Sequence, residues 1–335
     1  RHGGSRDQVE TLAAALAVMV LASATVTAVP GSSATPLIPG GSSVQADLVS
    51  ADDRADVGGS IRLSPTVRFV VESDEDRYWR AAAYDRYTGG GWIRTGSNQR
   101  LQNPQAPGER ETLTQTFTAK TTLDVLVAAA RPQSVTNASV AVTEQDTLDL
   151  TKTLRPGDQY EVTSQVPAAS EADLRTAGDD YPDRIREMYL QVPETTGKRV
   201  TSLTANVTAG ADSDYERAER IEEWLQQTKQ YDTKVSKPSG DIAESFLFKM
   251  ESGYCVYFAT AMTTMLRTQD IPARYVVGYT SGESVGEETN VVRGYDSHAW
   301  VEVYVPDQGW IQFDPTPAQP RQAAEQSELA AAREE

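Results

Sequence analysis

The chain has 335 residues, with 48 Asp and Glu against 31 Lys and Arg, which gives a formal net charge of −17. A chain this acidic lacks the basic patches that binding to nucleic acid requires. Its length exceeds the size at which a single hydrophobic core keeps growing, so we expect two folded domains. Only seven of the basic residues are lysines, and this composition favours a protein adapted to high salt over an ordinary acidic protein.

The N-terminal segment carries an uncharged run of 18 residues, Leu12–Val29. This length is the lower limit for a transmembrane helix, and the arginines before it agree with the positive-inside rule. We expect residues 1–10 to be a cytoplasmic flank and 11–30 a transmembrane helix or signal anchor, which puts the main domains on the extracytoplasmic face of the cell membrane. A signal-peptide core and a buried soluble helix are the alternatives. The chain begins with Arg, so we expect a fragment of a longer protein.

The next segments differ in composition. Residues 31–58 are rich in Gly, Pro and Ser and predict a flexible linker. Residues 59–167 contain short β-branched runs between turn signals, which predicts an all-β sandwich or small barrel. The expected strands are Thr66–Glu72, Thr112–Lys120, Leu123–Ala129, Ser139–Val142 and Gln159–Gln165.

The second half has helical periodicity. Ser213 and Glu216 form a capping-box pattern before an apolar stripe, which predicts an amphipathic helix over residues 214–229. A second helix is expected to open at Cys255, since the stripe that follows it has helical spacing: Phe258, Met262, Met265 and Leu266. Cys255 therefore falls in the first turn of that helix.

Cys255 is the only cysteine of the chain. It therefore forms no disulfide within the chain, and with so few histidines it cannot complete a zinc site. The N-terminus of a helix favours the thiolate, and its free N–H groups can stabilise an oxyanion. A catalytic nucleophile and a small buried hydrophobic residue are the two interpretations of this cysteine.

His298 opens a strand pattern that alternates along residues 298–305, with Ala299, Val301 and Val303 on one face and His298 on the other. A turn then returns the chain toward Asp314. If Val305–Gly309 form a five-residue loop, Asp314 pairs with Trp300 and lies diagonally beside His298, about 7 to 8 Å away between backbones. A four-residue loop would turn Asp314 to the opposite face.

Together these residues have the composition of a thiol triad, in which Cys255 is the nucleophile, His298 the base and Asp314 the group that fixes the imidazole tautomer. Taken singly, His298 is also explained as a satisfied half-buried histidine and Asp314 as a turn residue before proline. The conjunction of the three in this order favours catalysis.

The chain resembles the transglutaminase-like superfamily, and more specifically its membrane-anchored prokaryotic TgpA-type branch. The motifs that carry the resemblance are Gly253-Tyr254-Cys255, Ile271-Pro272-Ala273-Arg274, His298-Ala299-Trp300-Val301-Glu302, Gly309-Trp310, Asp314-Pro315-Thr316 and, near the N-terminus, Tyr78-Trp79-Arg80. The resemblance implies an α+β, papain-like core over residues 168–318, with the all-β domain before it and a tail, 319–335, leading to a further segment. It also implies that Cys255, His298 and Asp314 are the catalytic triad, and with the composition it suggests a halophilic archaeal source. One departure is Asp270, where the family usually has Gly.

The expected activity is acyl transfer from protein amides, most simply a protein-glutamine γ-glutamyltransferase reaction on protein or peptide substrates such as cell-envelope proteins. A cysteine peptidase or deamidase would use the same triad, and a non-catalytic scaffold ectodomain is the alternative of another class. We expect Tyr254, Trp300 and Tyr231 to wall the site. No cofactor and no metal are expected, since the chain has no EF-hand calcium loop.

Overall fold

The computed structural model describes residues 48–49, 52–61, 63–101 and 107–334. The predicted membrane segment, 11–30, lies outside these ranges. Within them, no helix is both long enough and apolar enough to cross a membrane. The described residues belong to one compact unit, and the description below concerns them alone.

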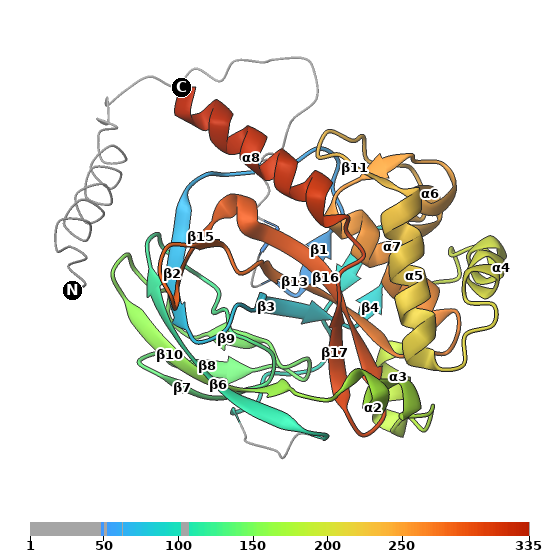
Figure 1. Cartoon of the computed structure of the whole chain (residues 1–335), viewed down its shortest axis with the longest axis horizontal. Helices are drawn as coiled ribbons and strands as arrows, with labels where there is room; N and C mark the ends of the chain where they lie inside the picture. The colour runs from blue at the N-terminus through green and yellow to red at the C-terminus, as the bar shows by residue number, and fades with distance from the viewer. Residues whose placement is uncertain (1–47, 50–51, 62, 102–106, 335) are drawn as a thin grey trace, which may run out of the picture. The chain divides into compact units, whose positions relative to one another are not determined.

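Two antiparallel sheets organise the chain (Figure 1). The first has four strands in the order β17-β16-β13-β3, with bounds Gly309–Phe313, Ser297–Val305, Ala273–Tyr279 and Trp79–Tyr84. The second has six strands in the order β14-β15-β2-β6-β10-β7, with bounds Glu283–Ser284, Thr289–Arg293, Val67–Ser73, Arg110–Ala119, Gln159–Pro167 and Pro132–Thr136.

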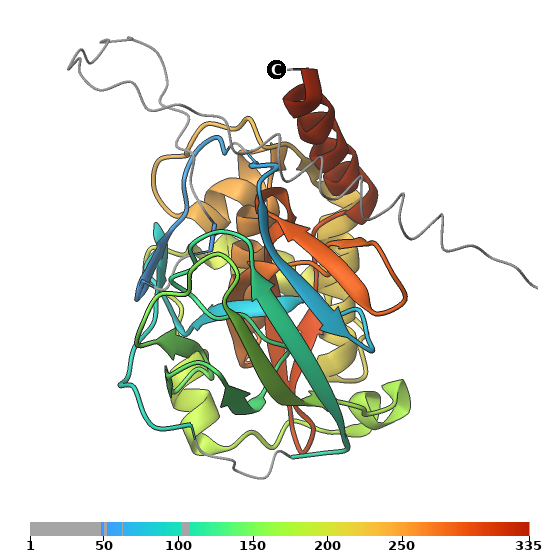
Figure 2. The same ribbon diagram turned by 90° about the vertical axis from the view of Figure 1, so that its left-hand side faces the viewer.

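Three small sheets complete the strands. They are β1-β5-β4 (Arg54–Asp56, Gly91–Ile93, Arg86–Tyr87), the parallel pair β11-β12 (Gln230–Tyr231, Ser252–Gly253) and the pair β8-β9 (Val140–Val142, Leu148–Leu150). The six-stranded sheet is in front in the side view of Figure 2.

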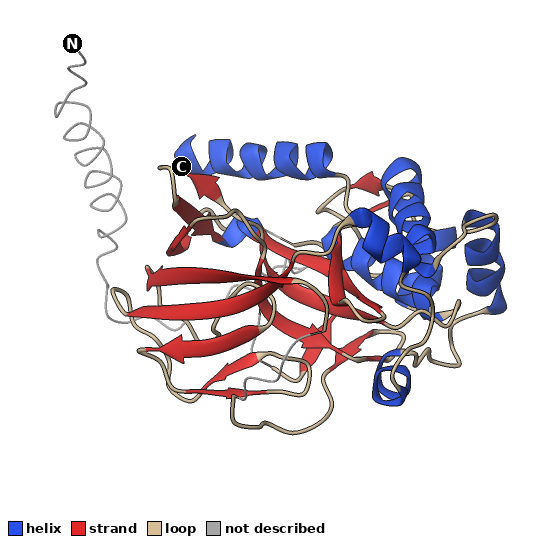
Figure 3. Ribbon diagram, turned by 60° about the horizontal axis from the view of Figure 1, so that its bottom comes forward, coloured by secondary structure: helices blue, strands red, loops and turns tan. Residues whose placement is uncertain are grey.

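The helices of the described residues gather mainly on one side of the strands (Figure 3). Their bounds are α2 Glu171–Thr176, α3 Asp183–Tyr189, α4 Lys198–Val207, α5 Asp214–Thr228, α6 Ile242–Phe248, α7 Cys255–Arg267 and α8 Ala318–Glu334, with a 3-10 turn, η1, at Gly294–Asp296. Helix α8 runs apart from α4–α7. The fold is therefore the expected mixture of helices and antiparallel sheets.

The two halves of the sequence exchange strands. β3, from the N-terminal half, forms the edge of the four-stranded sheet beside β13. β15, from the C-terminal half, pairs with β2 in the six-stranded sheet. Each of the two large sheets thus contains strands from both sides of residues 167 and 168. The division of the sequence at this point into two domains stays a proposal.

Helix α7 is the centre of the larger hydrophobic core. All of its residues are buried, and the aliphatic face of β16, with Ala299, Val301 and Val303, lies in the same apolar cluster. This is the face that the alternation predicts to be packed. Because α7 and β16 pack together, the start of the helix and the start of the strand are held close to each other.

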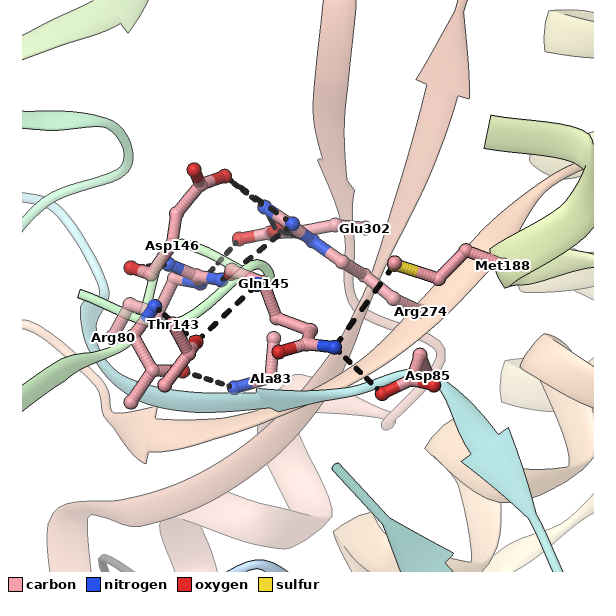
Figure 4. A network of polar contacts seen from close by, with 10 residues as sticks. Arg80, Ala83, Asp85, Thr143, Gln145, Asp146, Met188, Arg274 and Glu302 are labelled. Carbon is pink, nitrogen blue, oxygen red and sulfur yellow. Dashed lines mark hydrogen bonds and ion pairs between the residues drawn. The ribbon is translucent and has the colours of Figure 1, made fainter. Parts of the chain in front are cut away.

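On the opposite face of β16, Glu302 takes part in a network of charged and polar groups (Figure 4). Glu302 of β16 accepts hydrogen bonds at 2.6 Å from Arg274 of β13 and pairs with Arg80 of β3 at 3.4 Å. Arg80 and Arg274 both donate to the backbone carbonyl of Gln145. Removing one partner of such a buried ion pair typically costs about 3 to 5 kcal/mol, so this network ties β16 firmly to the neighbouring strands.

Most of the predicted elements are present, and one prediction is wrong. Residues 123–129 form no strand, although they are buried: Leu123 bridges only to Leu154, and the N–H groups of Val127 and Ala129 donate to the side chains of Tyr160 and Gln115. Ala128 forms an isolated bridge with Arg80 of β3, so the segment is held by single bridges and buried side chains and not by a continuous ladder.

Two segments outside the two expected domains contain regular structure. The last residues of the expected linker 31–58 form β1, and Val57 is buried in the core. The expected tail 319–335 is helical almost throughout, because α8 covers residues 318–334.

Candidate active site

Cys255 is the first residue of α7, as predicted, and the local sequence explains why the helix starts there. Tyr254 is the N-cap, with an extended backbone, and its carbonyl accepts a hydrogen bond from Tyr257 N at 2.8 Å. A Cβ on Gly253 would come within 2.8 Å of the Phe246 ring and 3.0 Å of Tyr257. Only glycine therefore allows the chain to pass from β12 into the helix so tightly. Cys255 thus belongs to the first turn, where the N–H groups of a helix have no carbonyl four residues earlier in the helix to bond to.

His298 lies near the start of β16, opposite Gly278 of β13. Like Cys255, it is only 1% exposed. The Cys255 side chain is one of the groups whose interaction with the His298 ring raises the pKa of that ring. Because Nε2 of the ring faces Asp314, Nδ1 is the nitrogen left for the thiol.

Asp314 follows directly on β17, and its position depends on the register of the β16–β17 hairpin. Val305 pairs with Gly309 and Val301 with Phe313. This is the register that the five-residue loop predicts. It places the Asp314 carboxylate on the His298 side, with Oδ2 2.8 Å from Nε2.

The Asp314 carboxylate has two further donors. The Tyr78 hydroxyl donates to Oδ2 at 2.8 Å, and the backbone N–H of Thr316 donates to Oδ1 at 3.0 Å. The contact from Thr316 is an Asx turn, in which an aspartate bonds to the backbone two residues on. All of these contacts favour the ionised carboxylate.

The charges of the site reinforce one another. Burial alone would lower the pKa of His298, but the Asp314 charge, the hydrogen bond to it and the hydrogen bond to Cys255 together raise that pKa to about 9. Burial likewise acts to raise the pKa of Asp314, yet His298 and the hydrogen bonds from Thr316 and Tyr78 bring it below its usual value. At neutral pH His298 is therefore an imidazolium beside a carboxylate, which is the partner that a thiolate needs.

The three expected wall residues lie in different places. Tyr231 pairs with Gly253, and Tyr254 immediately precedes the thiol. Burial and the neighbouring Cys255 charge raise the pKa of Tyr231, while burial, Tyr257 and Cys255 raise that of Tyr254. Trp300 is buried behind His298, with the two rings nearly parallel and their centroids 6.4 Å apart. Contact of these residues with substrate stays a prediction.

Sequence reasoning missed several residues of the site. Tyr78 was quoted only as part of a family motif, and the α5 residues Glu222 and Gln226, which bond to the Asp314 backbone, were not singled out. Thr316 had a signal, because Asp-Pro-Thr is a typical Asx-turn sequence. The others had none, since each lies at least 88 residues from Asp314 along the chain.

Two families match the chain. Residues 2–171 match the TgpA N-terminal domain, and residues 201–315 match the transglutaminase-like superfamily.

Similar proteins agree with these families. An uncharacterized protein, YebA, of Bacillus subtilis is 28% identical over 297 residues, and a protein-glutamine gamma-glutamyltransferase of Pseudomonas aeruginosa is 29% identical over 283 residues. The matches cover 78% and 81% of this chain but only 40% of each relative's length. The crystal structure of the periplasmic domain of TgpA from Pseudomonas aeruginosa has the same fold, with a TM-score of 0.62 and 23% identity over 83% of this chain and 98% of that domain. The chain thus belongs to the TgpA family of proteins with a transglutaminase-like core.

Proposed function

We propose that this chain is the extracytoplasmic part of a membrane-bound thiol acyltransferase that uses Cys255, His298 and Asp314 as its catalytic triad. The observation that carries the proposal is the His298–Asp314 pair, with Nε2 2.8 Å from Oδ2. Cys255, at the start of α7, interacts with the same His298 ring. The family membership and the name of the Pseudomonas aeruginosa relative support glutamine side chains of proteins as the acyl donor. The periplasmic origin of the related structure supports the location and, with it, cell-envelope proteins as substrates.

The proposed reaction has two steps. The Cys255 thiolate attacks the carboxamide carbon, and the N–H groups at the start of α7 stabilise the oxyanion. His298 gives its proton to the leaving nitrogen, so ammonia departs and a thioester remains. A primary amine then attacks the thioester while His298 takes up its proton, which yields a new amide and restores the thiolate beside the imidazolium.

The second nucleophile decides the reaction class. Water in place of the amine yields glutamate, which is deamidation, and attack on a backbone amide instead of a side chain is peptidase chemistry. The triad is the same in each case. The name of the related enzyme favours an amine acceptor.

The test offers one acyl donor under two conditions. Dimethylated casein is incubated with the purified protein, with and without the fluorescent amine dansylcadaverine, and amine incorporation, ammonia and peptide fragments are measured for the wild type and for Cys255→Ala. We expect incorporation with matching ammonia release by the wild type and neither by the variant. Fragments would indicate a peptidase, and ammonia alone a deamidase. If a panel of glutamine peptides also gives no product, the chain is a non-catalytic scaffold and the proposal is wrong.

A further inference from the structure

The Tyr78 hydroxyl shares one oxygen of Asp314 with His298. Both groups contact Oδ2 at 2.8 Å, the hydroxyl from one direction and the imidazole Nε2 from another. The Tyr78 ring also meets the His298 ring edge to face, with centroids 5.6 Å apart, and meets Trp300 in the same way at 5.4 Å. One side chain therefore contacts both the carboxylate and the ring that it orients.

We propose that Tyr78 is a positioning residue of the triad, which fixes the His298 ring and limits the hold of Asp314 on the imidazolium. The proposal rests on the proposed function, because positioning matters to the reaction only if His298 transfers protons. Tyr78 precedes β3, whose pairing with β13 fixes it beside the site. It lies within the segment that matches the TgpA N-terminal domain and outside residues 201–315, so the transglutaminase-like segment alone lacks this contact.

The Tyr78 hydroxyl and the His298 imidazolium share the negative charge of one carboxylate oxygen. A carboxylate oxygen that accepts two hydrogen bonds binds each donor less strongly than one that accepts a single bond, so the hydroxyl weakens the stabilisation of the imidazolium. Burial and the Asp314 charge raise the pKa of Tyr78, and the phenol therefore stays protonated as a donor. A less tightly held imidazolium is the stronger acid and gives its proton more readily to the leaving amine.

Other charged groups act on the same cluster, and the test must leave them unchanged. They are Arg321 and Glu325 of α8, Glu222 of α5 and the Cys255 thiol. Tyr78→Phe keeps the ring, its edge contacts and all of these groups, and removes only the hydroxyl. Tyr84→Phe is the matched control, because Tyr84 is a buried tyrosine of β3 whose hydroxyl donates to the Asp52 carbonyl instead.

The readout is the titration of His298 itself. The full sequence has two histidines, His2 and His298, so NMR of histidine-labelled protein gives two ring signals, and His2→Ala assigns them. We expect Tyr78→Phe to raise the pKa of His298 by about half a unit to one unit, and Tyr84→Phe to leave it unchanged. Replacing Tyr78 by 3,5-difluorotyrosine, a stronger donor of the same size, should lower the pKa of His298. This second change keeps the test decisive if the Phe variant folds poorly.

Activity gives the second readout. Tyr78→Phe should lower kcat several-fold at unchanged KM and move the alkaline limb of the pH profile upward with the His298 pKa. A His298 titration that is the same in wild type, Tyr78→Phe and the fluorinated protein would overturn the proposal. A shifted titration in a protein without acyl-transfer activity would instead support the coupling and overturn the proposed function.

Discussion

Glu222 of α5 accepts a hydrogen bond from the backbone N–H of Asp314 at 2.6 Å. One helical turn further on, Gln226 donates to the Asp314 carbonyl at 2.8 Å. The peptide groups on both sides of Asp314 are therefore held by one helix. Because the backbone is fixed in this way, the carboxylate can be aimed at His298 even though it lies beyond the end of β17.

Replacement of Glu222 tests how much stability the protein loses because this carboxylate is buried near Asp314. Burial and the Asp314 charge raise the pKa of Glu222 to about 7, in spite of the N–H donor. The folded protein therefore holds a proton that the unfolded chain loses above about pH 4.5, so stability falls as the pH rises from about 4.5 to 7. Glu222→Gln keeps an acceptor and removes the charge. We expect it to be more stable than the wild type at pH 8 by roughly 1 to 2 kcal/mol, and equal to it at pH 4.

Chemical unfolding at the two pH values measures this difference. The control is Glu223→Gln at the exposed neighbouring position, which should follow the wild type at both. If the two variants are equally stable at both pH values, the buried position of the Glu222 carboxylate does not lower the stability of the protein.

The raised pKa of His298 predicts that stability also falls in the alkaline half of the pH range. Its pKa is raised in the folded protein to about 9 from the ordinary 6.5. The stability that its charge contributes is fully present below about pH 6.5 and is lost as the pH rises through 9, with a maximum on the order of 3 kcal/mol. The difference in unfolding free energy between the wild type and His298→Gln should shrink over that interval. A difference that is constant from pH 6 to 10 would mean that His298 is not held as an imidazolium.

Asp314→Asn tests the role of the carboxylate without changing the size of the side chain. An amide cannot accept from His298, Tyr78 and the Thr316 N–H together, and it carries no charge to stabilise the imidazolium. We expect kcat/KM to fall by about 1,000-fold, with the alkaline limb of the pH profile moved to lower pH. A variant that keeps the wild-type pH profile would argue that Asp314 is only a turn residue.

Asp270 ends α7 in a left-handed conformation, with φ +58°. Ile271 N bonds to the Leu266 carbonyl and Asp270 N to the Arg267 carbonyl, which is the Schellman pattern with Asp270 at the position that prefers glycine. Asp270→Gly should therefore raise stability by up to about 1 kcal/mol. Thr268→Gly, two residues earlier in an ordinary helical conformation, should lower it by roughly 0.5 to 1 kcal/mol. Thermal unfolding shows whether each variant is more or less stable than the wild type. A destabilised Asp270→Gly would mean that the left-handed conformation does not strain Asp270.

The parts of the site that the sequence predicts correctly are those set by local pattern. Cys255 is at the start of a helix because the apolar stripe after it has helical spacing. The Asp314 register depends only on a short loop within one hairpin. Alternation along β16 assigns Ala299 and Val301 to the packed face because α7 covers that face and no other.

The parts that it does not predict depend on distant residues. β3 is buried on both faces, so Trp79–Tyr84 shows no alternation. Residues 123–129 have the composition of a strand but bond to buried side chains. The Tyr78 contact with Asp314 spans 236 positions of the chain, and no local pattern connects two such residues.

If Cys255 carries the acyl group, the mass of the enzyme during turnover reveals it. A glutamine peptide is mixed with the protein, the reaction is stopped in acid, and the intact mass and the Cys255 peptide are determined. We expect a gain equal to the mass of the peptide minus ammonia, on Cys255 alone. The gain should disappear when a primary amine is added and should be absent in His298→Gln. Product formation by Cys255→Ala, or by a wild type that never carries the acyl group on Cys255, would contradict this role of Cys255.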